Sequence, residues 1–181
     1  MNYIFLDNGF EEIEALTPVD LLRRAGIEVT TVGVSSTTVT GAHGITVFAD
    51  MSYTDATARL GEDMEMVILP GGMPGTKNLD ASATVSAFLA VCRIQNIPVA
   101  AICAAPMILG KRGILKGKNA TCFPGFEEYL EGATVGGRAV RDGQVITGVG
   151  MGAALEFGIE IVAALKGREE ADKLFAAVLA K

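Results

Sequence analysis

The chain has 181 residues, enough for one domain with a sizeable core, and 50% of them are hydrophobic. A formal net charge of -6 and a pI of about 4.8 argue against a nucleic-acid binder and against a basic membrane-surface helix. No apolar run approaches the roughly 20 residues that a membrane-spanning helix needs, so one globular domain over residues 1–181 is expected.

Strands and helices alternate along most of the sequence. Apolar or β-branched runs predict strands at 2–6, 28–34, 66–69, 98–102 and 119–123, and two more around the Asp-Gly turn within 138–147. Helical spacing predicts helices over 11–24, 83–95, from 104 onward, near 126–130, over 151–165 and over 168–179, while 37–49 is interpreted as a β-hairpin. This order predicts an α/β fold with a mostly parallel sheet, helices on both faces and a ligand site at the carboxyl ends of the strands.

The first predicted helix contains a proline. Because proline removes a helical hydrogen bond, Thr17 is expected to cap a second segment that begins at Pro18, with Asp20 in its first turn. Gly26 is expected to end that segment, as glycine commonly does at helix termini.

The cysteines are Cys92, Cys103 and Cys122. An odd number, behind an N-terminus without signal-peptide features, predicts reduced thiols and a cytoplasmic location. With one histidine and no Cys-x-x-Cys pair, no metal site is expected. Cys92 lies in an apolar helix and Cys122 in a strand, so both are interpreted as small buried hydrophobes.

Cys103 differs because it lies where a buried strand meets a helix start. Alanines at 101, 104 and 105 leave room for a tight turn, and Pro106 suits the first turn of a helix. Such an elbow holds a nucleophile above the sheet, and the helix dipole is expected to lower the pKa of the thiol. The context alone leaves a reactive thiol and a merely packed one as comparable alternatives.

The segment after the first strand carries Glu11, Glu12 and Glu14. Acidic residues are ordinary partners of a helix dipole, which is the simpler explanation. A carboxyl group in a partly apolar crevice would instead have a raised pKa and could pass a proton to or from a thiol.

Two glycine-rich stretches follow strands. Gly71 and Gly72, in LPGGMPG, could aim backbone N–H groups at a developing negative charge, although Pro-Gly-Gly is also common in turns. The stretch 148–153 fits G-x-G-x-x-A, but only helices follow it, so a dinucleotide site is rejected.

Four segments together resemble the ThiJ/PfpI superfamily, which is class I glutamine amidotransferase-like, and most closely its parkinsonism-associated deglycase branch. They are FEEIEALTPVDLLRRAGIEV, VILPGGMPGTKNL, VAAICAAPMILG and GVGMGAALEFGIEIVAALKGRE. The resemblance implies a flavodoxin-like three-layer sandwich and a homodimer. It also implies that Cys103 is the nucleophile, that Glu14 hydrogen-bonds it, and that the N–H groups of Gly72 and Ala104 form an oxyanion-hole-like pocket.

The sequence departs from the family pattern at several positions. Ala104 stands where the protease-like branch has histidine, which argues against a cysteine peptidase. Phe123 stands where some deglycase-branch members have histidine. The only histidine, His43, lies in the predicted hairpin near a basic residue of the relatives, and Arg24 matches an arginine near the dimer interface. The further candidate members of the pocket are Gly71, Arg24, His43 and Phe123.

The expected function is a cofactor-free enzyme of the glutathione-independent glyoxalase or deglycase type. Cys103 would attack a small aldehyde or a glycated substrate, and Glu14 would shuttle protons. The alternatives are a redox-sensing or chaperone-type stress protein that acts through oxidation of Cys103, and, less favoured, a cysteine peptidase or amidase. No nucleic-acid or membrane partner is expected.

Overall fold

Strands in the middle of the central sheet, such as MVIL at 66–69 and VAAI at 99–102, are short, continuous apolar runs, as expected of strands covered on both faces. In the computed structural model, which describes residues 1–180, seven strands form this sheet in the order β10-β11-β7-β6-β1-β2-β5. All neighbours are parallel except β10 and β11. Their bounds are β1 Asn2–Leu6, β2 Val29–Gly33, β5 Met51–Ser52, β6 Met66–Leu69, β7 Val99–Ile102, β10 Ala139–Asp142 and β11 Val145–Gly148.

Two small strand pairs lie outside this sheet. An antiparallel hairpin joins β3 (Thr38–Thr40) to β4 (Thr46–Phe48), within the predicted segment 37–49. A parallel pair joins β8 (Asn119–Ala120) to β9 (Thr134–Val135). The strand predicted over 119–123 is therefore shorter, since it ends at Ala120.

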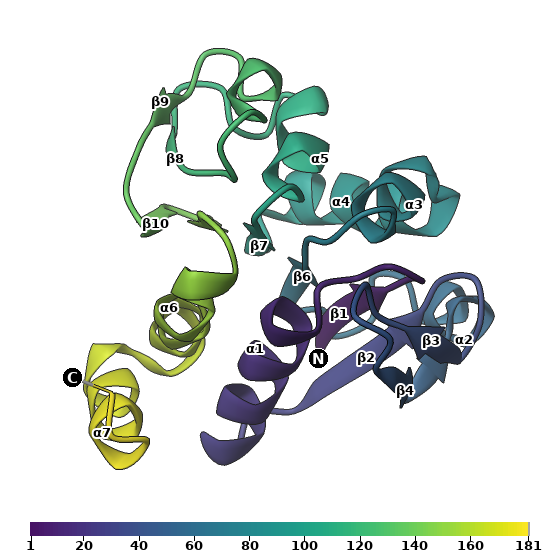
Figure 1. Cartoon of the computed structure of the whole chain (residues 1–181), viewed down its shortest axis with the longest axis horizontal. Helices are drawn as coiled ribbons and strands as arrows, with labels where there is room; N and C mark the ends of the chain where they lie inside the picture. Colours follow the sequence, from purple (N-terminus) through teal and green to yellow (C-terminus); the bar gives the residue numbers. More distant parts are fainter. Residues whose placement is uncertain (181) are drawn as a thin grey trace.

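Helices cover both faces of the sheet, with α1, α6 and α7 on one side and α3, α4 and α5 on the other (Figure 1). Their bounds are α1 Glu12–Arg24, α2 Tyr53–Ala58, α3 Gly75–Ala81, α4 Ala83–Gln95, α5 Pro106–Lys111, α6 Ala154–Lys166 and α7 Arg168–Ala177, with 3-10 turns η1 Glu127–Tyr129 and η2 Met151–Ala153. The predicted α/β class and the mostly parallel, two-face-covered sheet are confirmed.

The two core layers follow from the alternation of side chains along each strand. In β1, Tyr3 and Phe5 join the layer under α4 and pack edge-on against Phe88, at ring-centroid distances of 5.1 and 5.0 Å. Ile4 and Leu6 point the other way, into the layer under α1 and α6. One strand therefore anchors both halves of the core.

Helix α1 corrects one expectation. It runs without a break from Glu12 to Arg24 with Pro18 inside it, so Thr17 does not cap a second segment. Proline removes only the hydrogen bond to the carbonyl four residues earlier, and the flanking turns are held by burial of Ala15, Val19 and Leu22 against the sheet. The short helices α2 and α3 were not predicted, because six or seven residues carry too little periodicity.

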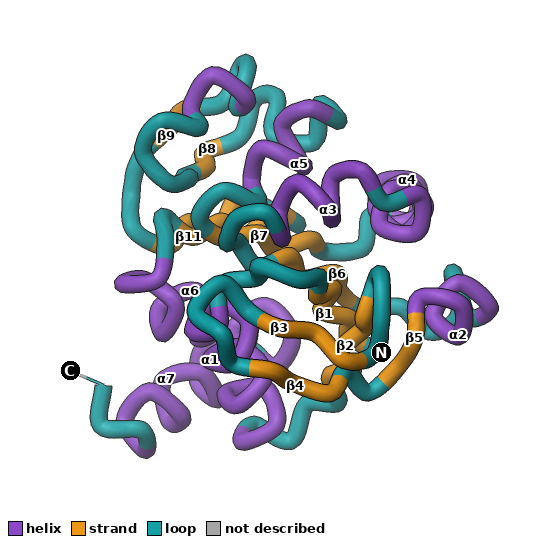
Figure 2. The backbone as a smooth tube through the Cα atoms, turned by 45° about the vertical axis from the view of Figure 1, so that its right-hand side comes forward, coloured by secondary structure: helices purple, strands orange, loops and turns teal. Residues whose placement is uncertain are grey.

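The carboxyl ends of β1, β6, β7 and β11 lie at the same end of the sheet, next to the start of α1 and the β3–β4 hairpin (Figure 2). Hydrogen bonds from Gly9 N–H to the Thr40 carbonyl and from Ala42 N–H to the Phe10 carbonyl attach the hairpin to the loop after β1. Among residues 1–180, no helix has the length and apolar character to span a bilayer.

The packing of Phe88 generates a stability prediction. Its side chain is fully buried against two rings, so Phe88→Ala should lower the free energy of unfolding by about 3–5 kcal/mol. Ile94→Ala, on the same helix but at an 82% exposed position, should change it by less than about 0.5 kcal/mol. Urea denaturation measures both, and equal effects would contradict the assignment of this layer as the core.

Candidate active site

Cys103 lies at the turn from β7 into α5, and its φ of +64° is left-handed. The turn is held on both sides, because the Cys103 N–H donates to the Gly148 carbonyl at 2.8 Å and its carbonyl accepts from the Phe123 N–H at 2.7 Å. Ala104 and Ala105 are buried beneath it. A strained backbone that its surroundings fix in this way is typical of functional positions.

Glu14 reaches this turn from the first turns of α1. Its side chain is 1% exposed, and one carboxylate oxygen, Oε2, accepts the Gly71 N–H at 3.0 Å. The Cys103 thiol and the Met151 N–H also lie close enough to the carboxyl group to lower its pKa. The acid and the thiol predicted for the site are therefore neighbours.

Gly71 allows Glu14 and Cys103 to lie this close together. A Cβ atom at this position would lie 2.5 Å from Glu14 Oε2 and 2.6 Å from Cys103 Cβ, so any side chain would separate the two groups. The N–H groups of Gly72, at φ +90°, and of Ala104 lie close enough to the Cys103 sulfur to lower its pKa. These two donors are those that an oxyanion-hole-like pocket would use.

Burial sets the proton affinity of the pair. It raises the pKa of Glu14 to about 7, although the hydrogen bonds from Cys103 and Gly71 act in the opposite direction. Burial and the Glu14 carboxylate also raise the pKa of Cys103. The expectation of a lowered thiol pKa is therefore wrong, because α5 has only six residues and its dipole does not offset these two effects. Near neutral pH the thiol therefore keeps its proton, while Glu14 is about half ionised.

The loop after β11 contributes more than the sequence indicated. A Cβ at Gly150 would lie 3.3 Å from the Phe123 ring and 3.9 Å from Glu14 Oε1, so both side chains border this turn. Phe123 is 48% exposed, which places its ring at the outer side of the site. The stretch rejected as a dinucleotide motif thus forms one wall, and the parallel pairing of β11 with β7 is the signal that could have located it.

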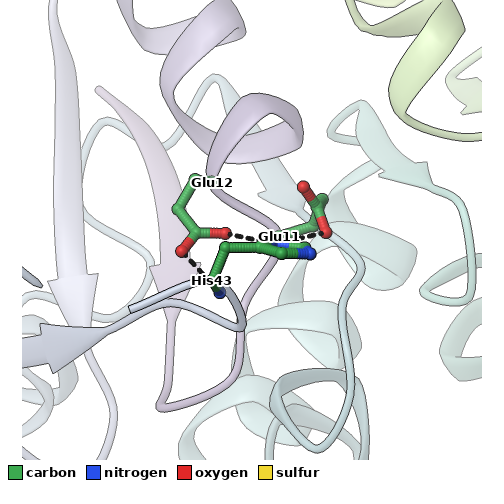
Figure 3. Close-up of side chains that lie close together, drawn as sticks. All are labelled: Glu11, Glu12 and His43. Atoms are coloured by element: carbon green, nitrogen blue, oxygen red, sulfur yellow. Dashed lines mark hydrogen bonds and ion pairs between the residues drawn. The ribbon is translucent and has the colours of Figure 1, made fainter. Parts of the chain in front are cut away.

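His43 lies beside the site rather than on the thiol. Its ring Nδ1 is 3.1 Å from Glu12 Oε2 and 3.5 Å from Glu11 Oε2, and Figure 3 shows the ring between the two carboxylates. The hydrogen bond to Glu12 raises the pKa of His43. Burial opposes ionisation of Glu12, but its own N–H and those of His43 and Ile45 lower its pKa overall.

The same three residues are the group best placed to hold a cation in the part of the chain described, with one donor atom each within 4.8 Å of the others. The Glu12 carboxylate, however, already accepts the N–H groups of His43 and Ile45 at 2.8 and 3.3 Å. The cluster therefore serves to attach the β3–β4 hairpin to α1.

Arg24 is not brought to the thiol. It lies at the other end of α1 from Glu14, about 15 Å along the helix, and is exposed. Its guanidinium pairs with Asp20 at 2.6 Å. Arg24 instead lines an apolar groove with Ile13, Leu16 and Leu179.

Comparison with known proteins agrees with this geometry: residues 2–164 match the DJ-1/PfpI family. The chain belongs to this family. It is 35% identical over 183 residues to the Danio rerio Parkinson disease protein 7 homolog, covering 98% of this chain and 96% of that protein. A deglycase of Pyrococcus horikoshii is 32% identical over 137 residues, 75% of this chain and 80% of that enzyme.

Other DJ-1 proteins differ in length but share the fold. Arabidopsis thaliana DJ-1 homolog B is 35% identical over 168 residues, which are 91% of this chain but only 38% of that longer protein. The solved structure of oxidised Toxoplasma gondii DJ-1 superposes with a TM-score of 0.91 at 32% identity, covering 98% of this chain and 97% of that one.

The raised pKa of Glu14 predicts a pH-dependent stability. The pKa of Glu14 is about 7 in the fold instead of 4.5, so the unfolded chain ionises first as the pH rises. The free energy of unfolding therefore falls by up to about 3 kcal/mol between pH 4.5 and pH 7. Glu14→Gln lacks that loss, so it should gain stability relative to the wild type between pH 5 and pH 8. Urea denaturation at both values tests this, with the exposed Glu62→Gln as control. A difference between Glu14→Gln and wild type that is independent of pH would contradict the prediction.

Proposed function

We propose that this DJ-1/PfpI protein is a cofactor-free enzyme that converts reactive carbonyls, such as methylglyoxal, to hydroxy acids. The observation that carries the proposal is the placement of the Cys103 thiol and a buried Glu14 carboxyl, whose pKa is about 7, side by side at Gly71. A general base with a pKa near the working pH is efficient. The resemblance to a relative named as a deglycase supports the same class of substrate.

The first step joins the thiol to the aldehyde. Cys103 Sγ bonds to the aldehyde carbon as its proton passes to a Glu14 carboxylate oxygen. The developing alkoxide is held by the N–H groups of Gly72 and Ala104, which lie near the sulfur. Glu14 then returns the proton to that oxygen, which gives a neutral hemithioacetal.

The second step moves a hydrogen within the bound molecule. The Glu14 carboxylate removes the hydrogen of the former aldehyde carbon as a proton and delivers it to the neighbouring carbon. The proton of the new hydroxyl passes to the oxygen on that neighbouring carbon, which leaves a lactoyl thioester on Cys103. Water then cleaves the C–S bond, which releases lactate and restores the thiol. The net change is the addition of one water to methylglyoxal, so no oxidant or metal is required.

A second candidate function is redox sensing at the same sulfur. Cys103 is the one cysteine of the three that is not fully buried, and the Toxoplasma relative was solved in an oxidised form. A peroxide would convert the thiol to sulfenic acid with release of water, and further to sulfinate. The carboxyl of Glu14 would hydrogen-bond that product.

The enzymatic proposal predicts lactate formation from methylglyoxal without glutathione. Cys103→Ser should abolish it, and Glu14→Gln should lower kcat by about 100-fold or more because the general base is lost. For the wild type, kcat/KM should rise with pH through about 7 as Glu14 ionises. Glu62→Gln is the control variant.

Two outcomes would decide against that reading. Equal turnover in wild type and Glu14→Gln would remove the proton-shuttle role. Absence of lactate from the wild type would exclude this activity. Oxidation of Cys103 would then be the function to test, by mass spectrometry after mild peroxide treatment.

We also propose that the protein is a homodimer joined through α1. The groove lined by Ile13, Leu16 and Leu179 is apolar, and these side chains are 47%, 37% and 83% exposed. Exposed apolar patches of this kind mark interaction surfaces. Arg24 lies at the same groove, as its family counterpart would at the interface.

This dimer proposal predicts a mass of twice 18.8 kDa in sedimentation velocity. Leu16→Glu should shift the protein to monomer, because it buries a charge in the apolar contact. Ile94→Glu, at an exposed position on the opposite helical layer, should leave the dimer intact. A wild-type monomer at micromolar concentration would overturn the proposal.

A further inference from the structure

A cavity of about 640 Å³ opens at the end of the sheet opposite the thiol. Val99 and Val145, the first residues of the parallel strands β7 and β11, pair with each other and line it. Cys103 follows the other end of β7, about 13 Å away along the strand. The cavity is therefore separate from the candidate active site, and neither its shape nor its residues take part in the proposed reaction.

Cationic side chains surround this cavity. Arg93, Lys118 and Arg141 all line it. The carboxylate of Asp142 is 3.6 Å from the Lys118 Nζ, whereas the guanidinium groups of Arg93 and Arg141 have no ion-pair or hydrogen-bond partner among residues 1–180. Such a concentration of positive charge is unexpected in a chain of net charge -6. Two free guanidinium groups match the planar, two-oxygen geometry of a carboxylate.

The floor of the cavity is apolar, and the apolar surface continues beyond it. Ile97 and Ile114 line the cavity together with the two valines. A second cavity of about 470 Å³, lined by Leu89 and Ile94, shares Arg93 and Ile114 with the first. The side chain of Ile94 is 82% exposed there. A cationic pocket thus adjoins an apolar groove, with Arg93 at the junction.

We propose that these two adjacent cavities together bind a medium-chain fatty-acid anion. Its carboxylate would lie between Arg93, Lys118 and Arg141, and its acyl chain would pass over Ile114 toward Ile94. The charge at one end and the apolar lining at the other match the two parts of such a ligand, and the volumes are those of ordinary small-molecule sites. The site is independent of the chemistry at Cys103.

Isothermal titration calorimetry with decanoate, below its micelle concentration, tests the carboxylate pocket. The wild type and Cys103→Ser should bind equally. The double variant Arg93→Ala/Arg141→Ala should bind about tenfold more weakly or worse, because charge-assisted hydrogen bonds are lost. Both arginines are exposed and unpaired, so the variant should fold, which circular dichroism checks. Arg59→Ala, with an equally exposed arginine elsewhere, should bind as the wild type does.

The acyl groove is tested separately. Ile94→Asp places a negative charge in the groove at an exposed position, so decanoate should bind more weakly while the helix content stays unchanged. Decanol should bind more weakly than decanoate to the wild type, because it lacks the charge. Absence of decanoate binding, equal binding by the double arginine variant, or equal binding of decanol and decanoate would each overturn the proposal.

Discussion

The site depends on the absence of a single carbon atom. Gly71 lies between Glu14 and Cys103 with only a hydrogen atom as its side chain, and its N–H donates to the Glu14 carboxylate. Two unfavourable features, a buried carboxyl and a left-handed cysteine, are tolerated around it because the neighbouring strands and loops hold them. The candidate site is thus located where the backbone is strained and a carboxyl group is buried, and the surrounding sheet supplies the stability.

Much of this architecture could be predicted from local patterns. The elbow at Cys103 is visible because small residues and a proline follow an apolar strand, and each of these acts within a few positions. Continuous apolar runs such as 66–69 and 98–102 likewise identify central strands. The acidic segment 11–14 offered Glu14 as a proton carrier, and resemblance to a family then placed it opposite the thiol, which no local pattern could do.

The features that the sequence did not predict depend on contacts between segments far apart in the chain. The loop at Gly150 became part of the site only because β11 pairs with β7. The direction of the Cys103 pKa shift depends on burial by several elements and on a carboxylate from another helix, while the sequence showed only a nearby helix start. Helix α1 passed through Pro18 because tertiary burial of its other residues outweighs one lost hydrogen bond.

The edges of the sheet limit how this protein can assemble. At one edge, β5 has only two residues, and at the other β10 carries Arg141 and Asp142 beside the short β8–β9 pair. Short or charged edge strands resist pairing with a further strand. Extension of the sheet from one molecule into the next is therefore disfavoured at both edges, which directs the homodimer proposed above to the helical faces.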